Sequence, residues 1–281
     1  MKPLEGIRAV SLAINLPGPV AAMRLRELGA EIVKIEPPSG DPLALACRAY
    51  YEHLSSGQSI VTMDLKSTAD RARLNTCLAG SDLLLTAHRA SALERLGLEW
   101  RVLHKQFPRL CHVALAGYPP PDDSFPGHDL MFQAASGLLD PPRMPRTPLA
   151  DLGAAEEAAT MAVALILVRE RTGESGYAQV SIAETGKRFA LPARYGLTVG
   201  GLLGGVLPSY GIYRAREGYV AFAALEAHYL ERFLGAHGLQ KATREEFERL
   251  FLTSTAGEWE AWARKHNVPL AAVYQFENDE G

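Results

Sequence analysis

Acidic and basic side chains stand at the starts of predicted helices at several points of the chain. Asp151 opens the long segment DLGAAEEAATMAVALILV, and the pair His128 and Asp129 stands between a Pro-Gly turn and the apolar run LMFQAAS. A carboxylate at the positive end of a helix either caps the helix or stays ionised and acts as a base or nucleophile. A histidine transfers protons near neutral pH. These residues indicate proton-transfer or nucleophilic chemistry, or helix caps without chemistry.

The two members of the His128 and Asp129 pair are suited to different tasks. Asp129 fits an N-cap better than a catalyst, whereas His128 lies just outside the helix, as either a structural histidine or a general acid/base. A histidine and an aspartate on opposite sides of one carbon atom would suit inversion by proton transfer, but the spacing of the residues does not show which side chains meet. Gly153 would let a substrate approach the backbone of the helix that Asp151 opens.

Two further charged residues stand beside predicted strands. Glu226 follows the apolar strand VAFAAL and precedes a helix that begins at Ala227, so it is either a helix-start acid or a functional carboxylate. Arg89 opens a helix after the strand DLLLT. An arginine at the carboxyl edge of a parallel sheet suits a phosphate, although an ordinary surface cation explains the residue equally well.

The elements that must position these residues alternate between strands and helices. This alternation predicts an α/β fold with a mostly parallel sheet covered on both faces. Strands are predicted at residues 7–13, 31–36, 59–65, 82–86, 110–115 and 177–182, and helices at residues 19–30, 68–79, 90–96, 99–107 and about 151–171.

Composition changes near residue 190, which predicts a division of the chain. Residues 1–190 form the large domain with the catalytic motifs, residues 191–209 a Gly-rich linker with little regular structure, and residues 210–281 a small α+β domain. The small domain is expected to contain a hairpin that turns at Glu217-Gly218, three helices and a last strand at residues 268–276.

Composition and motif content exclude several classes of function. The 29 Lys and Arg residues nearly balance 32 Asp and Glu residues, so no basic surface for nucleic acid is expected. No phosphate-binding glycine motif, metal-ligand spacing or membrane-spanning segment occurs. Three widely spaced cysteines favour a reducing compartment. We therefore predict a cytoplasmic protein without a metal.

Taken together, the motifs resemble those of one family, the class III CoA-transferases and the related α-methylacyl-CoA racemases. The matching stretches follow each other in the family's order from residue 4 to about residue 235. They are LEGIRAVSLA, PGPVAAMRLRELGAEIVKIEPPSGDP, IVTMDLKS, LERLGLEW, FPRLCHVALAGY, PGHDLMFQAASGLL, PLADLGAAEEAA, RERTGESGYAQVSI and GGLLGGVLPSYGIYRAREGYVAFAALE.

The resemblance implies a Rossmann-like large domain with a smaller α+β domain. It also implies a homodimer that either interlocks or is completed by a partner chain. Coenzyme A enters as the acyl thioester substrate, with no tightly bound cofactor, and Arg89, Lys66, Pro17 and Gly18 are the residues expected to contact it.

Two activities are implied for the site. In the racemase branch, the residues matching Asp151 and His128 exchange the α-proton of a 2-substituted acyl-CoA, and the residue matching Glu226 supports the histidine. In the transferase branch, Asp151 attacks the thioester and carries CoA to an acceptor acid as an aspartyl thioester. The GHD triplet, the GGLLGG loop and the ALE motif favour the racemase pattern.

Departures from the family pattern support a third hypothesis, that of a shortened and catalytically silent binding or subunit partner. SSGQS replaces a basic motif that binds the nucleotide end of CoA, and the chain stops within the small domain. The stretch from His128 to Asp151 is shorter than in racemases. Small glycines after the aspartate are replaced by residues 154–157, AAEE, which predicts a bulkier and more acidic pocket floor.

Overall fold

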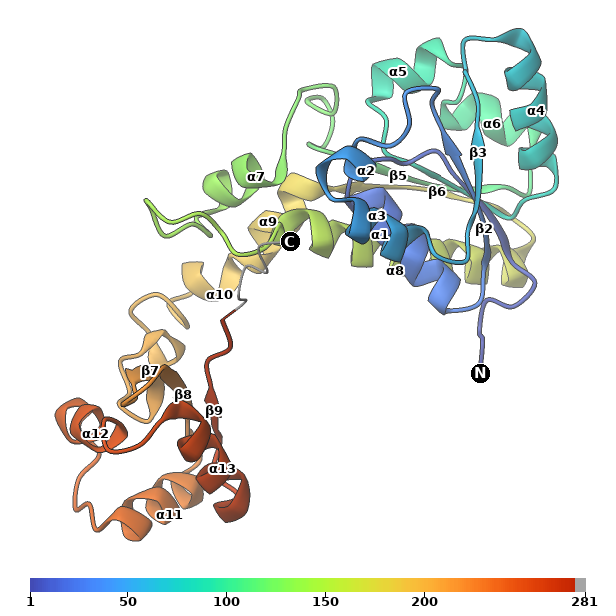
Figure 1. Cartoon of the computed structure of the whole chain (residues 1–281). Helices are drawn as coiled ribbons and strands as arrows, with labels where there is room; N and C mark the ends of the chain where they lie inside the picture. The colour runs from blue at the N-terminus through green and yellow to red at the C-terminus, as the bar shows by residue number, and fades with distance from the viewer. Residues whose placement is uncertain (276–281) are drawn as a thin grey trace. The chain divides into compact units, whose positions relative to one another are not determined.

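A computed structural model of the chain describes residues 1–275, and these residues form two compact units. The first unit is Met1–Ala190 and the second begins at Leu191 (Figure 1). Buried apolar side chains gather into separate clusters within each unit. Each unit therefore has a hydrophobic core of its own.

A six-stranded parallel sheet forms the centre of the first unit (Figure 1). Its strand order is β3-β2-β1-β4-β5-β6, so the direction of winding reverses between β1 and β4. In open sheets of this kind, ligands bind beyond the carboxyl ends of the strands at the point of reversal. The strands are β1 (Arg8–Ser11), β2 (Glu31–Glu36), β3 (Ser59–Thr62), β4 (Leu83–Thr86), β5 (Cys111–Ala116) and β6 (Tyr177–Ser181).

Helices cover both faces of this sheet because successive strand side chains point to opposite sides. In β4, Leu83 and Leu85 belong to one core cluster and Leu84 to the other. Helices α1 (Pro17–Glu27) and α8 (Leu149–Thr172) contribute to the first cluster, and α4 (Thr68–Ala79), α5 (Ala90–Arg95) and α6 (Trp100–Gln106) to the second. Each fully buried leucine contributes about 2 kcal/mol. The predicted α/β fold is confirmed.

Helix α8 packs against α1 and β5 along a face of small side chains. Six of its buried residues are alanines, including Ala154, Ala158 and Ala162, which recur one helical turn apart. Small side chains let the neighbouring helix approach closely. The helix ends where Gly173 adopts a left-handed conformation with φ of 80°. It begins two residues before the predicted start at Asp151.

Several helices of the first unit lie where the sequence analysis predicted no element. Helix α2 (Pro42–Ala46) is only five residues long, and Asp41 caps it by accepting a hydrogen bond from the backbone N–H of Leu43. Such short helices carry too few residues for a periodic apolar pattern. The others are α3 (Arg48–Ser55) and α9 (Ile182–Phe189). The helix predicted on the apolar run after His128 is confirmed as α7 (Asp129–Ser136).

The second unit combines a three-stranded antiparallel sheet with the helices α11, α12 and α13. The strand order is β7-β8-β9, and the β7–β8 hairpin turns at Gly218, whose φ is 79°. Its core is aromatic, with Phe222 packed 4.5 Å from the ring of Phe233. The elements are β7 (Tyr210–Arg214), β8 (Tyr219–Ala223), β9 (Leu270–Ala272), α11 (Ala227–His237), α12 (Arg244–Phe251) and α13 (Ala256–His266).

Two segments of the second unit differ from the sequence prediction. The Gly-rich stretch 191–209 contains a short helix, α10 (Leu191–Arg194), and a 3-10 turn, η1 (Leu202–Gly204), so it is more regular than expected. The last strand is shorter than the predicted 268–276, and Phe276 lies outside the described residues. None of the helices within residues 1–275 is long and apolar enough to cross a membrane.

Candidate functional site

A cavity of about 440 Å³ lies at the carboxyl ends of the strands where the sheet reverses, and we call it the switch-point cavity. The loops after β1 and β4 and the end of β5 form its walls, together with the starts of α2, α7, α8 and α9. It is lined by residues 14–17, 42, 43, 46, 87–89, 115–117, 123, 125–128, 151 and 182. The fold therefore brings segments from the whole first unit to one site.

Asp151 lies in the first turn of α8 and lines the switch-point cavity. It is the third residue of the helix and not its N-cap, which is Pro148, so the capping interpretation is wrong. Its side chain accepts no hydrogen bond from any other residue between 1 and 275. Burial and, secondly, the negative charge of Asp129 raise the pKa of Asp151 from 3.8 to about 7.

Asp129 is the first residue of α7, but its carboxylate does not cap that helix. Its Oδ1 accepts a hydrogen bond of 3.0 Å from the backbone N–H of Asp151, in the next helix. Its Oδ2 accepts from Gln133 Nε2, which also donates to the carbonyl of Thr147 at 3.0 Å. Asp129 therefore ties the start of α8 to α7 and places a negative charge beside Asp151.

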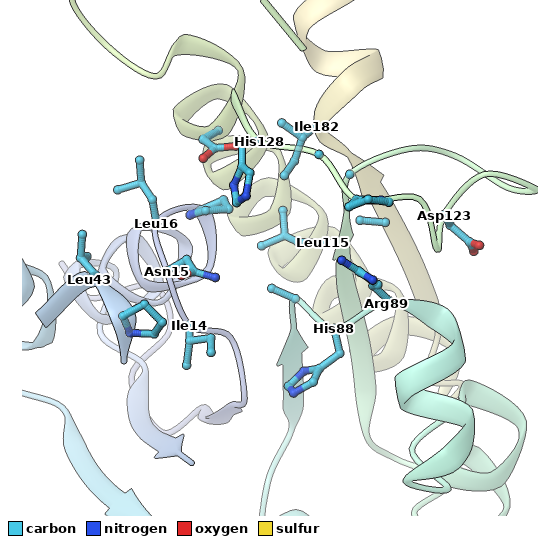
Figure 2. Close-up of a pocket in the computed structure, with 18 of the residues that line it drawn as sticks. Ile14, Asn15, Leu16, Leu43, His88, Arg89, Leu115, Asp123, His128 and Ile182 are labelled. Carbon is cyan, nitrogen blue, oxygen red and sulfur yellow. The ribbon is translucent and has the colours of Figure 1, made fainter. Parts of the chain in front are cut away.

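His128 occupies the N-cap position of α7, although its side chain makes no capping hydrogen bond. The ring is exposed, and Figure 2 shows it directed into the switch-point cavity. Asp151 lines the same cavity. The short stretch between the two residues therefore leaves both of them at one site.

Arg89 and Pro17 also line the switch-point cavity. Arg89 is exposed at the N-cap position of α5, and its guanidinium has no hydrogen-bond or ion-pair partner in the part of the chain that the structure describes. Figure 2 shows Arg89 on the β4 side of the cavity, where a free cation would face an anionic group of a ligand. Pro17 is the first residue of α1 and is buried.

Lys66 lies outside the switch-point cavity. It lines a smaller cavity of about 190 Å³ beyond the carboxyl ends of β1, β2 and β3. Ile14 and His88 line both cavities and so form the wall between them. Burial lowers the pKa of His88, and its Nδ1 is buried with no hydrogen-bond partner among the described residues.

The glycines of the predicted site serve close packing. A Cβ on Gly18 would lie 2.1 Å from the Cβ of Ala13, so only glycine lets α1 begin this close to the loop after β1. A Cβ on Gly153 would lie 2.2 Å from the ring of Phe189 in α9. Gly153 therefore accommodates a neighbouring helix, and the interpretation that it admits a substrate is wrong.

The expected acidic pocket floor is also wrong. Glu156 pairs with Arg24 at 2.9 Å, and Glu157 pairs with Arg188 and accepts a hydrogen bond of 2.9 Å from Thr185. Neither glutamate lines the switch-point cavity. Successive residues of a helix point in different directions, so residues five and six positions after Asp151 do not share its face.

Glu226 belongs to the second unit, at the N-cap position of α11. Its side chain is exposed and makes no capping hydrogen bond. The structure thus offers no capping role for this carboxylate. Its proposed support of His128 stays a prediction.

A buried charged cluster beside the switch-point cavity was not predicted from the sequence. Lys34 is 0% exposed and Asp41 is 2% exposed, and Lys34 Nζ lies 2.6 Å from Asp41 Oδ2 and 2.8 Å from Glu36 Oε1. Tyr51 donates to Glu36 at 2.8 Å. The strand EIVKIE could have predicted this cluster, because its lysine stands between apolar residues and a buried lysine requires a charged partner. The described residues contain no cluster that could hold a metal ion.

Comparison with protein families gives one match that covers almost the whole chain. The model of CoA-transferase family III matches residues 4–278. Human alpha-methylacyl-CoA racemase is 27% identical over 91% of this chain and 74% of its own length. The alpha subunit of succinyl-CoA–L-malate CoA-transferase from Chloroflexus aurantiacus is 31% identical over 88% of this chain, but the match spans only 60% of that subunit.

Solved structures share the fold over nearly the full chain. A hypothetical protein from Mycobacterium tuberculosis superposes with a TM-score of 0.84 at 22% identity, covering 98% of this chain and 84% of the other. A CAIB/BAIF family protein from Brucella suis superposes with a TM-score of 0.81 at 20% identity and the same coverage. Identities this low establish the fold alone.

Proposed function

The chain belongs to CoA-transferase family III, and on this premise we propose that it exchanges the α-proton of a 2-substituted acyl-CoA in the switch-point cavity. Asp151 and His128 are the two acid/base groups of this proposal. One observation carries it: a carboxyl group with a pKa of about 7 lines the same cavity as a histidine. A carboxyl group and an imidazole at one site can each donate or accept a proton.

The reaction follows from the chemistry of a thioester. One group removes the α-proton and leaves an enolate, whose negative charge lies mainly on the thioester oxygen. The other group returns a proton to the opposite face of the α-carbon. Each turnover exchanges the roles of the two groups, so no net proton is consumed. The raised pKa of Asp151 suits both roles because a general acid/base works best when its pKa is near the working pH.

Arg89, Lys66, Pro17 and Gly18 are proposed to serve CoA binding. The unpaired guanidinium of Arg89 suits a phosphate group of the nucleotide end. Lys66 lines the smaller cavity, so a CoA that contacts both residues would pass the shared wall at Ile14 and His88. Pro17 contributes an apolar wall, whereas Gly18 acts through packing.

A direct test follows deuterium into the α-carbon of 2-methylpropanoyl-CoA in buffered D2O. This substrate is achiral, so exchange can be measured by mass spectrometry without a change in the product. We expect incorporation by the wild type and its loss in Asp151→Asn and in His128→Gln. Both replacements are close in size to the original side chains, so thermal unfolding of each variant serves as the control for folding. Absence of exchange by the wild type would refute the proposal.

CoA transfer is the second candidate, and the free carboxylate of Asp151 favours it. Because this side chain accepts no hydrogen bond from the rest of residues 1–275, its oxygens are available to attack a thioester. The attack would form an acyl-aspartyl anhydride and release the CoA thiolate, which would then displace the acyl group as a carboxylate and leave an aspartyl-CoA thioester. Hydroxylamine should trap the acylated enzyme on the peptide that contains Asp151, and His128→Gln should leave this trapping intact.

Calorimetric titration with CoA and 2-methylpropanoyl-CoA separates both enzyme proposals from a silent binding partner. An enzyme of either type requires binding of the thioester. A chain that binds neither ligand would instead support the partner hypothesis.

We also propose that the protein forms a homodimer. Apolar side chains are exposed along the end of α8, where Leu167 is 48% and Val168 49% exposed. Light scattering coupled to size-exclusion chromatography tests this, and a single-chain mass would contradict it. A cytoplasmic location stays a prediction from the sequence.

A further inference from the structure

Asn15 has an unusual backbone conformation at the edge of the switch-point cavity. Asn15 and Asn267 are the two residues other than glycine, within residues 1–275, that have a positive φ, at 70° and 50°. Asn267 follows the end of α13, where a left-handed residue is ordinary. Asn15 stands instead in the loop between β1 and α1, at the point where the sheet reverses. Uncommon backbone conformations of this kind concentrate at functional sites.

The buried charged cluster holds the Asn15 backbone in place. Asp41 Oδ1 accepts hydrogen bonds from the N–H of Asn15 at 3.0 Å and of Leu43 at 2.9 Å. Its other oxygen is paired with Lys34, and both ions are almost completely buried. Buried ions that lose a partner become strongly unfavourable, so this pairing fixes the position of the Asp41 carboxylate. One rigid anion thus sets the conformation of the loop that bears Asn15.

The side chain of Asn15 is free to meet a ligand. Its amide makes no hydrogen bond within the described part of the chain, and the residue is exposed. Figure 2 shows the side chain directed into the cavity from the β1 side. A thioester oxygen that gains negative charge needs a fixed hydrogen-bond donor. The Asn15 amide is a neutral donor on a fixed backbone, and it shares the cavity with Asp151 and His128.

We infer that Asn15 is a substrate-binding residue whose side-chain N–H donates to the carbonyl oxygen of the acyl thioester. Asp41, paired with Lys34, is the positioning residue that orients it. The inference rests on the proposed function and extends it, because it names the side chain that recognises the thioester carbonyl, which an acyl-CoA has and CoA lacks. The same contact would serve proton exchange and acyl transfer, since both develop charge on that oxygen.

The competing explanation is that asparagine stands here only because it tolerates a left-handed backbone. Asn15→Gly separates the two explanations. Glycine adopts a φ of 70° without strain, so this variant keeps the loop and removes only the amide. Asn15→Asp is the matched second variant, because it keeps the size of the side chain and replaces the donor with an acceptor.

The experiment compares two ligands by calorimetric titration. They are 2-methylpropanoyl-CoA and its thioether analogue S-(2-methylpropyl)-CoA, which lacks the carbonyl oxygen. We expect the wild type to bind the thioester more tightly than the thioether. In Asn15→Gly and Asn15→Asp, thioester binding should weaken by about three- to tenfold, the range for one hydrogen bond, with thioether binding unchanged. Equal losses for both ligands, or an unchanged preference, would overturn the inference.

Failure of the proposed function gives a different result. If the wild type binds neither CoA derivative, the proposed function fails and the inference falls with it. If the wild type binds both derivatives equally, only the inference fails.

Variants of Asp41 test whether this residue orients Asn15, and the measurement is again the preference for the thioester over the thioether. Asp41→Asn keeps an oxygen that can accept from Asn15 and Leu43, and Lys34 keeps Glu36 as its charged partner, so this variant should retain the preference for the thioester. Asp41→Ala removes the acceptor and should abolish the preference. A general loss of folded protein lowers the number of binding sites for both ligands alike and does not move the ratio of their affinities. The positioning role is refuted if Asp41→Ala retains the full preference for the thioester. It is also refuted if Asp41→Ala fails to fold and Asp41→Asn loses that preference.

Discussion

Replacement of Asp151 by asparagine is predicted to stabilise the protein at neutral and alkaline pH. In the unfolded chain the Asp151 carboxyl titrates near 3.8, whereas the folded chain keeps its proton up to about pH 7. Between these values the unfolded chain has released a proton that the folded chain still holds. The free energy of unfolding therefore falls as the pH rises through this interval and is constant above it.

The magnitude follows from the difference between the two pKa values. A separation of about three pH units corresponds to about 4 kcal/mol, of which about 3 kcal/mol is lost between pH 5 and pH 8. The asparagine introduced by Asp151→Asn has nearly the same shape and no titratable proton, and the backbone N–H at this position can still donate to Asp129. The stability advantage of the variant should thus be small near pH 4 and grow to as much as about 4 kcal/mol above pH 7.

Urea unfolding of both proteins, followed by circular dichroism at several pH values, measures this difference. The comparison cancels every titration that the two proteins share. A difference that stays constant from pH 5 to pH 8 would show that Asp151 is ionised like an ordinary surface aspartate. In that case, neither the buried carboxyl nor its role as a near-neutral acid/base could be maintained.

Three further predictions concern neighbouring features. Gly18→Ala should lower the free energy of unfolding by about 1–3 kcal/mol, measured in urea, because the added Cβ overlaps a buried side chain. The control is Gly235→Ala in α11, whose Cβ would meet nothing within 4 Å, so this variant should be neutral or slightly stabilising. Equal effects of the two substitutions would contradict the packing argument. Asp129→Asn should lower the pKa of Asp151 in a carboxyl-carbon NMR titration, but not to 3.8, since burial is the larger cause. Arg89→Ala should weaken CoA binding about tenfold and reduce its dependence on salt, and an unchanged affinity would remove Arg89 from the nucleotide site.

The fold of the first unit was predictable because each of its main elements leaves a periodic signal. Strands such as β4 and β5 are continuous apolar runs, and α4, which precedes β4, is long enough to show one buried face, with Leu74 and Leu78. Helices α2 and α3 lacked such a signal. Their stability comes from Asp41 and from tertiary packing, which a local window of sequence does not contain.

The candidate site was predictable in its residue types but not in its contacts. His128, Asp151 and Arg89 were identified from their places next to predicted helices, and all three line the switch-point cavity. The direction of the Asp129 carboxylate could not be predicted, because it caps a neighbouring helix 22 residues away in sequence. Asn15 was missed for the same reason: its conformation depends on Asp41, a contact across 26 residues.

Two acid/base groups on opposite faces of one α-carbon would both exchange its proton and invert its configuration, and a single-enantiomer substrate shows both changes. The protein is incubated with (S)-2-methylbutanoyl-CoA in D2O, and deuterium content and configuration are measured on the same recovered thioester. We expect deuterium at the α-carbon together with loss of the original configuration, and neither change in Asp151→Asn. Recovery of undeuterated substrate with its configuration intact from the wild type would show that Asp151 and His128 do not exchange the α-proton.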